Sequence, residues 1–127
     1  MRVLLDTHTL LWYAAGDPHL SATALAAVNA PNASSVVSAA TLWEIAIKVG
    51  LGKLSLGEPT ADFWARHSQN GVELLQISAE EALYVETLPL HHRDPFDRIL
   101  IAQSIIYQIP IISKDGVYDQ YGVSRIW

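Results

Sequence analysis

The sequence predicts an α/β fold, a central and mostly parallel sheet of four to five strands with helices on both faces. Short strand-like stretches alternate with helix-like stretches along the whole chain. The strand-like stretches are continuously apolar, which is typical of strands that are buried on both faces. With 127 residues, no internal repeat and no linker, the sequence indicates a single domain over residues 1–127.

The expected elements follow from apolar runs and from the residues that end them. Strands are predicted at 2–6, 35–39, 72–77, 109–113 and, as a short last strand, 123–126. Helices are predicted at 9–15, 21–30, 41–49, 60–70, 78–87 and 95–107. Gly16 and Pro31 are typical helix stops, Ser78 and Glu81 have capping-box spacing, and Pro95 suits the first turn of a helix.

The composition excludes several classes of protein. Half of the residues are hydrophobic and few are charged, so a core is available and disorder is not expected. The absence of cysteine excludes disulfides, thiolate metal sites and a Cys nucleophile. No stretch resembles a signal peptide or a membrane span, and we expect a cytoplasmic protein without membrane contact. The net charge of −5 is unusual for a nucleic-acid binder, unless carboxylates hold metal ions.

Four acidic residues fall where such a fold binds ligands, beyond the carboxyl ends of its strands. Asp6 ends the first predicted strand, and Asp115 follows the fourth. Glu44 and Asp97 lie in the first turns of helices that we expect to start at the same edge. We therefore predict that these carboxylates, from distant parts of the chain, converge on one catalytic site.

Converging carboxylates repel one another and lose hydration, a cost that a divalent cation removes. Oxygen ligands without His or Cys favour Mg²⁺ or Mn²⁺ over zinc. Such an ion can activate water and neutralise charge on a phosphodiester during cleavage. The four acids are therefore predicted to be both metal ligands and catalytic residues.

Each acid also has a purely structural interpretation. Glu44 completes a Thr41-x-x-Glu44 capping box and lies four residues before Lys48, a suitable ion-pair partner. Asp97 can pair with a neighbouring arginine, and Asp115 can start a turn. These alternatives stay open for each residue alone, whereas the matching positions of all four favour a metal site.

Supporting roles are predicted for residues beside the acids. Hydroxyl groups at the strand ends can orient a carboxylate or a metal-bound water, or can simply satisfy backbone groups; these residues are Thr7, Ser38 and Ser113. Basic side chains nearby can contact phosphates or can be ordinary solvated charges; these residues are Arg93, Arg98 and Lys114. Trp12, Trp43 and Trp64 lie on predicted helices, where we expect a core or interface position rather than base stacking.

The acidic stretches together resemble the PIN-domain toxins of bacterial VapBC toxin–antitoxin pairs. The stretches that carry the resemblance are Leu5-Asp6-Thr7-His8, Ala40-Thr41-Leu42-Trp43-Glu44-Ile45, Arg93-Asp94-Pro95-Phe96-Asp97-Arg98 and Ile112-Ser113-Lys114-Asp115. Their order and spacing match over essentially the whole chain. The resemblance implies a PIN-like domain and a metal-dependent endoribonuclease, with Asp6, Glu44, Asp97 and Asp115 as its acidic site. It also implies a homodimer that is inhibited by a cognate antitoxin protein. Asp94 belongs to the matching stretch as a helix cap rather than as a ligand.

Two other functions remain open at this point. A Mg²⁺-dependent phosphoryl-transfer protein, such as a phosphatase or receiver domain, would use Asp6 as a phosphate acceptor. A phosphatase of the haloacid-dehalogenase type would normally have a second Asp two residues later, where this chain has His8. A non-catalytic module that binds RNA or protein would gain nothing from clustered negative charge.

Overall fold

The protein is a parallel α/β domain, as predicted. The computed structural model describes all residues, 1–127. Its five strands pair only in parallel, in the order β3-β2-β1-β4-β5. The strands are β1 (Arg2–Leu5), β2 (Ser34–Ser38), β3 (Glu73–Leu75), β4 (Ile111–Ile112) and β5 (Arg125–Ile126). The most N-terminal strand therefore lies at the centre of the sheet.

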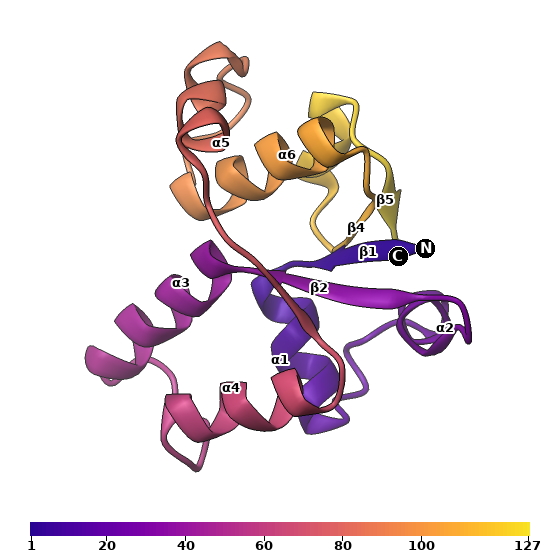
Figure 1. The fold of residues 1–127 in the computed structure, drawn as a ribbon, viewed down its shortest axis with the longest axis vertical. Helices are drawn as coiled ribbons and strands as arrows, with labels where there is room; N and C mark the ends of the chain where they lie inside the picture. The colour runs from indigo at the N-terminus through magenta and orange to yellow at the C-terminus, as the bar shows by residue number, and fades with distance from the viewer.

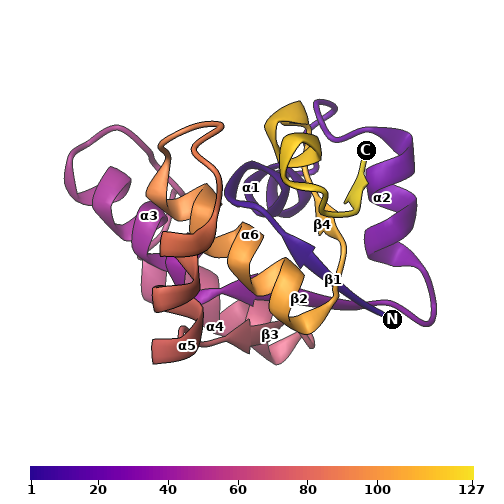
Figure 2. The same ribbon diagram turned by 90° about the horizontal axis from the view of Figure 1, so that it is seen from above.

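Helices cover both faces of the sheet (Figure 1). Helices α5 and α6 lie on one side, and α1, α3 and α4 lie on the other. The α-helices are α1 (Thr7–Ala15), α2 (Ala22–Asn29), α3 (Ala39–Gly50), α4 (Thr60–Gln69), α5 (Ala79–Tyr84) and α6 (Pro95–Tyr107); two short 3₁₀ helices are η1 (Val85–Thr87) and η2 (Gly116–Tyr121). Figures 1 and 2 show α2 beside β5 at one end of the molecule. None of the helices has the length and apolar character that crossing a membrane requires.

Alternate side chains of the central strands enter two different cores. Val3, Leu5 and Ile112 face the α1–α4 side, where they pack with buried residues of those four helices. Leu4 and Ile111 face the opposite side, where they pack against α6 and η2. Because both faces of β1 are buried, the strand is apolar at every position from 3 to 5. This burial explains the continuous apolar runs in the sequence.

The structure differs from the predicted elements mainly where side chains cap helices. Helix α3 starts at Ala39, because the Ser38 hydroxyl accepts a hydrogen bond from the backbone N–H of Ala40. The capping box predicted at Thr41 is therefore wrong, and the Thr41 hydroxyl is buried without a partner. Helix η2 was not predicted; Asp115 starts it by accepting a hydrogen bond from the N–H of Val117.

Gln108 ends α6 in the left-handed backbone conformation, at φ 55° and ψ 46°. This conformation costs about 1–2 kcal/mol for a residue with a Cβ atom, and glycine avoids that cost. The Gln108→Gly variant should therefore be more stable than the wild type by about 1 kcal/mol, as measured by urea unfolding. Gly122, which ends η2 at φ 75°, provides the matched reverse test. Since no atom lies within 4 Å of a Cβ built there, Gly122→Ala should lose stability through its backbone alone. A neutral or destabilising Gln108→Gly would contradict this account.

Candidate active site

The site lies at the carboxyl ends of β1 and β4, which are neighbours in the sheet. Asp6 directly follows β1 and caps α1, while Ser113 directly follows β4. Glu44 reaches the same edge from α3, the helix that begins immediately after β2. Asp97 comes from the first turn of α6. The parallel sheet thus brings together chain segments that lie far apart in the sequence.

Asp6 is a buried carboxylate without a cationic partner; only 7% of its surface is exposed. One of its oxygens accepts a hydrogen bond from the backbone N–H of Thr9, at 2.8 Å. The other accepts a hydrogen bond from the Ser113 hydroxyl. Burial raises the pKa of Asp6 above its ordinary value, although these hydrogen bonds act in the opposite direction. The carboxylate is therefore firmly held but electrostatically uncompensated.

Glu44 is equally buried, but a lysine neutralises it. Its Oε1 accepts a hydrogen bond from the Thr7 hydroxyl at 2.6 Å, and its Oε2 lies 2.7 Å from Nζ of Lys48. This ion pair between Glu44 and Lys48 is the structural interpretation of Glu44 that the four-residue spacing had left open. Because Thr7 follows Asp6 in the chain, the Thr7–Glu44 hydrogen bond ties the second acid to the first.

Asp97 is held by two residues whose role the sequence did not reveal. Tyr118 of η2 donates its hydroxyl hydrogen to Oδ1 at 2.9 Å, and Nε2 of His92 lies 3.2 Å from Oδ2. Burial, and next the nearby negative charge of Asp94, raise the pKa of Asp97 to about 6. Neither arginine beside it in the sequence pairs with it. Asp94 caps α6 through the backbone N–H groups of Phe96 and Asp97, as predicted.

Tyr118 lies near three of the acids. Its side chain is fully buried, and its pKa is raised by burial and then by the charges of Asp97, Asp6 and Asp115. The phenol therefore stays protonated and serves as a hydrogen-bond donor. Asp115 itself is exposed, but its backbone N–H donates to the same Ser113 hydroxyl that binds Asp6, at 3.0 Å. In the sequence, only the position of Tyr118, three residues after Asp115, pointed to a role of this tyrosine in the site.

The oxygen donors of the site suit Mg²⁺ or Mn²⁺, although the side chains alone do not provide a complete set of metal ligands. All the donors are oxygens, and the buried Asp6 carboxylate lacks the positive charge that a divalent cation would bring. No group of three His, Asp or Glu side chains is close enough together to hold one ion. Since Mg²⁺ usually keeps several waters, two carboxylates can suffice as direct ligands. The chemical type of these residues therefore fits such an ion, and water molecules would provide its remaining ligands.

The other predicted residues lie in different surroundings. Thr7 and Ser113 hydrogen-bond to acids, whereas Ser38 caps α3 instead. Arg93 and Lys114 are exposed near the acidic edge.

Arg98 differs from the expectation that it contacts RNA. Only 7% of it is exposed, and its guanidinium donates to the Tyr121 hydroxyl and to four backbone carbonyls, those of Val85, Leu88, Pro89 and His92. It therefore fixes the 85–92 segment, which carries His92, and it is not available to a phosphate.

The raised pKa of Asp97 predicts a pH-dependent stability in metal-free buffer. The folded state binds this proton more tightly than the unfolded state, whose pKa is near 3.8, so the wild type loses stability as pH rises from 3.8 through about 6. Asp97→Asn cannot ionise and should escape this loss. The stability of the variant relative to the wild type should improve by about 2 kcal/mol between about pH 4 and about pH 7. Urea unfolding of both proteins in EDTA at the two pH values measures this difference. A difference that does not change with pH would contradict the assigned environment of Asp97.

Comparison with solved structures reproduces the fold at low sequence identity. A chain in the structure of VapBC2 from Rickettsia felis bound to a promoter DNA fragment superposes with a TM-score of 0.73 and 14% identity, over 98% of this chain and 97% of that one. A chain of VapBC-1 from nontypeable Haemophilus influenzae gives a TM-score of 0.65 and 16% identity, over 98% and 96%. A chain of a toxin–antitoxin complex from Klebsiella pneumoniae gives 0.61 and 17%, over 89% and 86%.

Sequence comparison identifies the family. No curated protein sequence matches the chain significantly. The family model of the PIN domain, by contrast, matches residues 3–123, a span that contains every acid of the site. The chain therefore belongs to the PIN-domain family.

Proposed function

We propose that this protein is a metal-dependent endoribonuclease that acts as the toxin of a type II toxin–antitoxin pair. The observation that carries the proposal is that Asp6, Glu44 and Asp97 are each held by a hydroxyl group from another segment of the chain, in a domain of the PIN family. PIN domains generally use divalent metals, and toxins with this domain are typically nucleases. The similar structures include complexes named VapBC and a toxin–antitoxin complex, which supports a protein antitoxin as the partner. We propose that it acts in the cytoplasm, where it meets RNA.

In this proposal each hydroxyl group orients one acid. Ser113 holds Asp6, Thr7 holds Glu44, and Tyr118 holds Asp97, so that the carboxylates keep fixed positions before a metal binds. A bound Mg²⁺ or Mn²⁺ would activate water and neutralise charge on the phosphodiester. In the same proposal, the exposed side chains of Arg93 and Lys114 contact phosphates beside the scissile bond.

The match to the PIN-domain family over residues 3–123 disfavours the phosphoryl-transfer alternative. Detection of a stable aspartyl-phosphate would nevertheless favour that alternative. Failure to bind a divalent metal in titration calorimetry would favour a non-catalytic module.

The proposal is tested by Asp6→Asn, which keeps a good capping side chain but removes the charge. In Mn²⁺, cleavage of a structured RNA should fall by more than about 100-fold, because even residues behind a metal ligand contribute about 10–100-fold. In EDTA the variant should melt at or above the wild-type temperature, since an uncompensated buried charge is gone. In excess Mn²⁺ it should melt below the wild type, which gains about 2.7 kcal/mol at one hundred times the dissociation constant.

Asp62→Asn is the matched control, because Asp62 is an exposed acid in the first turn of α4, away from the site. It should cleave RNA and respond to Mn²⁺ as the wild type does. RNA cleavage by Asp6→Asn at the wild-type rate, or cleavage that persists in EDTA, would reject the metal-dependent mechanism. Equal destabilisation of Asp6→Asn in both buffers would show a structural role only.

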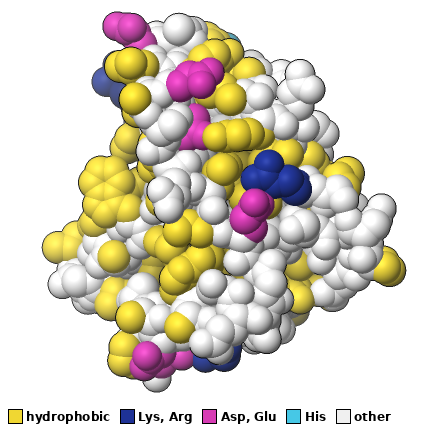
Figure 3. All heavy atoms as spheres, viewed as in Figure 1, with side chains coloured by type: hydrophobic (Ala, Val, Ile, Leu, Met, Phe, Trp, Pro, Cys, Tyr) yellow, Lys and Arg dark blue, Asp and Glu magenta, His cyan; other side chains and the backbone are white.

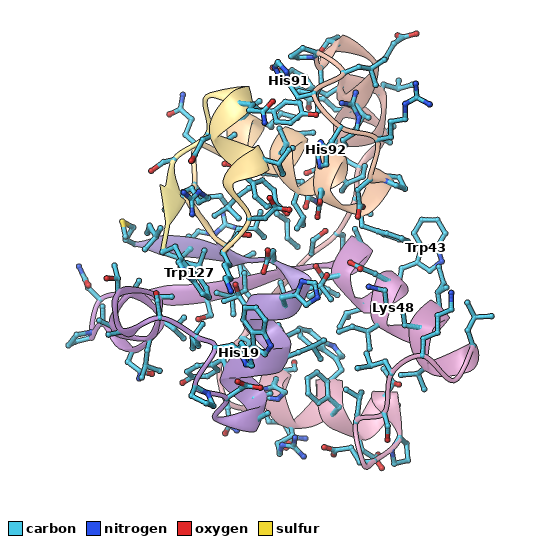
Figure 4. All side chains as sticks on the ribbon, turned by 180° about the vertical axis from the view of Figure 1, so that it is seen from behind. His19, Trp43, Lys48, His91, His92 and Trp127 are labelled. Atoms are coloured by element: carbon cyan, nitrogen blue, oxygen red, sulfur yellow. The ribbon has the colours of Figure 1, made fainter.

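We also propose that the chain forms a homodimer through a hydrophobic stripe on α3. Trp43, Ile47 and Leu51 follow at intervals of four residues and are 62%, 39% and 64% exposed. Figure 4 shows Trp43 pointing away from the body of the molecule. Its ring meets Phe96 of α6 edge-on, with centroids 5.4 Å apart, so the stripe continues onto a second helix. An exposed stripe of this kind is typical of a protein interface.

The dimer predicts twice the chain mass in light scattering at micromolar concentration. Trp43→Glu places a charge in the centre of the stripe and should reduce the measured mass to that of one chain. Leu25→Glu is the control, because Leu25 is an exposed leucine on α2 rather than on the stripe. A wild-type protein with the mass of one chain would contradict the dimer. If both variants had the mass of one chain, the interface would not be specific to the stripe.

A further inference from the structure

Three aromatic rings form a continuous column along one side of α1. Trp12 stacks on His8, one helical turn earlier, with centroids 5.4 Å apart and an interplanar angle of 26°. Trp12 also stacks on His19, at 5.4 Å and 21°. Asp17 fixes the His19 ring, because its Oδ1 lies 2.7 Å from Nδ1 of His19. The Trp127 ring packs against Trp12, with ring centroids 5.9 Å apart. The column is therefore held in place before any ligand binds.

The column starts at the acidic site. His8 lies two residues after Asp6 in the chain. His8 and Trp12 line a groove of about 460 Å³, and so does Thr7, whose hydroxyl donates to Glu44. None of the four acids lines the groove itself, but Thr7 and Lys48, which both contact Glu44, do so beside the aromatic column. His8 is exposed at the free end of the column, and no other aromatic ring of the protein covers it.

The groove also carries an unusual share of the basic residues. Three of the eight Lys and Arg residues line it, namely Lys48, Lys53 and Arg66, together with two acids, Asp17 and Glu58. Lys48 and Arg66 pair with Glu44 and Glu58, at 2.7 Å each. Lys53 is exposed and pairs with no carboxylate. By contrast, the face drawn in Figure 3 shows only isolated basic side chains.

We propose that a single-stranded segment of the RNA substrate follows this groove, with an unpaired base stacked on the exposed face of His8 and a phosphate bound by Lys53. The inference rests on the proposed function for its choice of RNA. Aromatic rings that offer a free face bind unpaired bases of any sequence, and a nearby cation binds the backbone between them. A base within a duplex cannot reach such a ring without leaving its own stack. The column would thus select unpaired segments next to the cleavage site.

A peptide is the competing occupant, because Leu54, Leu56 and Phe63 also line the groove. Those residues belong to α4 and to the loop before it, and they form an apolar wall of the groove. A peptide would use that apolar wall and the cations, but it would not need the free face of His8. The contribution of the His8 ring to RNA binding therefore separates the two occupants.

The test measures binding without cleavage. Fluorescence anisotropy in EDTA at low salt would follow a labelled single-stranded RNA of about ten nucleotides. His8→Ala should raise the Kd about fivefold or more, whereas His8→Phe, which keeps a stacking ring, should bind nearly as the wild type does. Lys53→Gln should reduce the slope of log K against log salt by about 0.7. A duplex of the same sequence should bind equally to the wild type and to His8→Ala.

His91→Ala is the matched control, because His91 is an exposed histidine that Figure 4 places far from His19. It should leave the Kd unchanged. The proposal is overturned if the single strand does not bind, if His8→Ala binds it as the wild type does, or if His8→Ala weakens duplex binding equally. RNA binding that is unaffected by both His8→Ala and Lys53→Gln would assign the groove to a peptide.

The outcome is independent of the nuclease assay. His8-dependent binding in EDTA, together with no cleavage in Mn²⁺, would reject the ribonuclease and keep the stacking site. Cleavage in Mn²⁺ together with His8-independent binding would reject the stacking site and keep the ribonuclease.

Discussion

The buried carboxylate of Asp6 is the constraint on which the site depends. A negative charge at the end of a central strand is costly, and the protein supplies only neutral hydrogen-bond donors to it. Those donors also shape the fold, because the Thr9 N–H starts α1 and the Ser113 hydroxyl joins the end of β4 to the end of β1. The same carboxylate therefore organises the local backbone and leaves a charge that only a ligand can compensate. The fold tolerates this arrangement because two cores, one on each face, hold the central strands in place.

The backbone arrangement was largely predictable from the sequence. Apolar runs marked the strands because both sheet faces are covered, and Pro95 marked the start of α6 at the residue where it begins. Four of the five strands proved shorter than predicted, and β4, for instance, covers only Ile111–Ile112; β2 keeps its predicted length of five residues. Apolar character reports burial, whereas a strand also needs a paired neighbour. Pattern therefore located the elements better than it located their ends.

The partners of the acidic side chains were much less predictable. The sequence offered Arg98 as a phosphate contact, but the tertiary fold surrounds it with carbonyl groups that need a donor. It offered a neighbouring arginine as the partner of Asp97, whereas the folded chain gives this acid His92, five residues earlier, and Tyr118 from η2. Local rules did identify Asp94 as a cap and Lys48 as the partner of Glu44, since both contacts lie within one helix. Contacts within one helix can be read from spacing, whereas contacts between distant segments cannot.

The strand order has a consequence for when the protein becomes active. The strand β1 lies at the centre of the sheet, whereas its neighbour β4 comes late in the chain. The hydrogen bonds from Ser113 to Asp6 and from Tyr118 to Asp97 can therefore form only after the C-terminal part of the chain has been made. A nascent chain that has emerged only as far as α6 already carries Asp6, Glu44 and Asp97 but lacks two of the three hydroxyl groups that hold them. The order of synthesis thus delays assembly of the acidic site until the 111–121 segment has joined the sheet. For the nuclease proposed above, such a topology would separate synthesis of the chain from its activity.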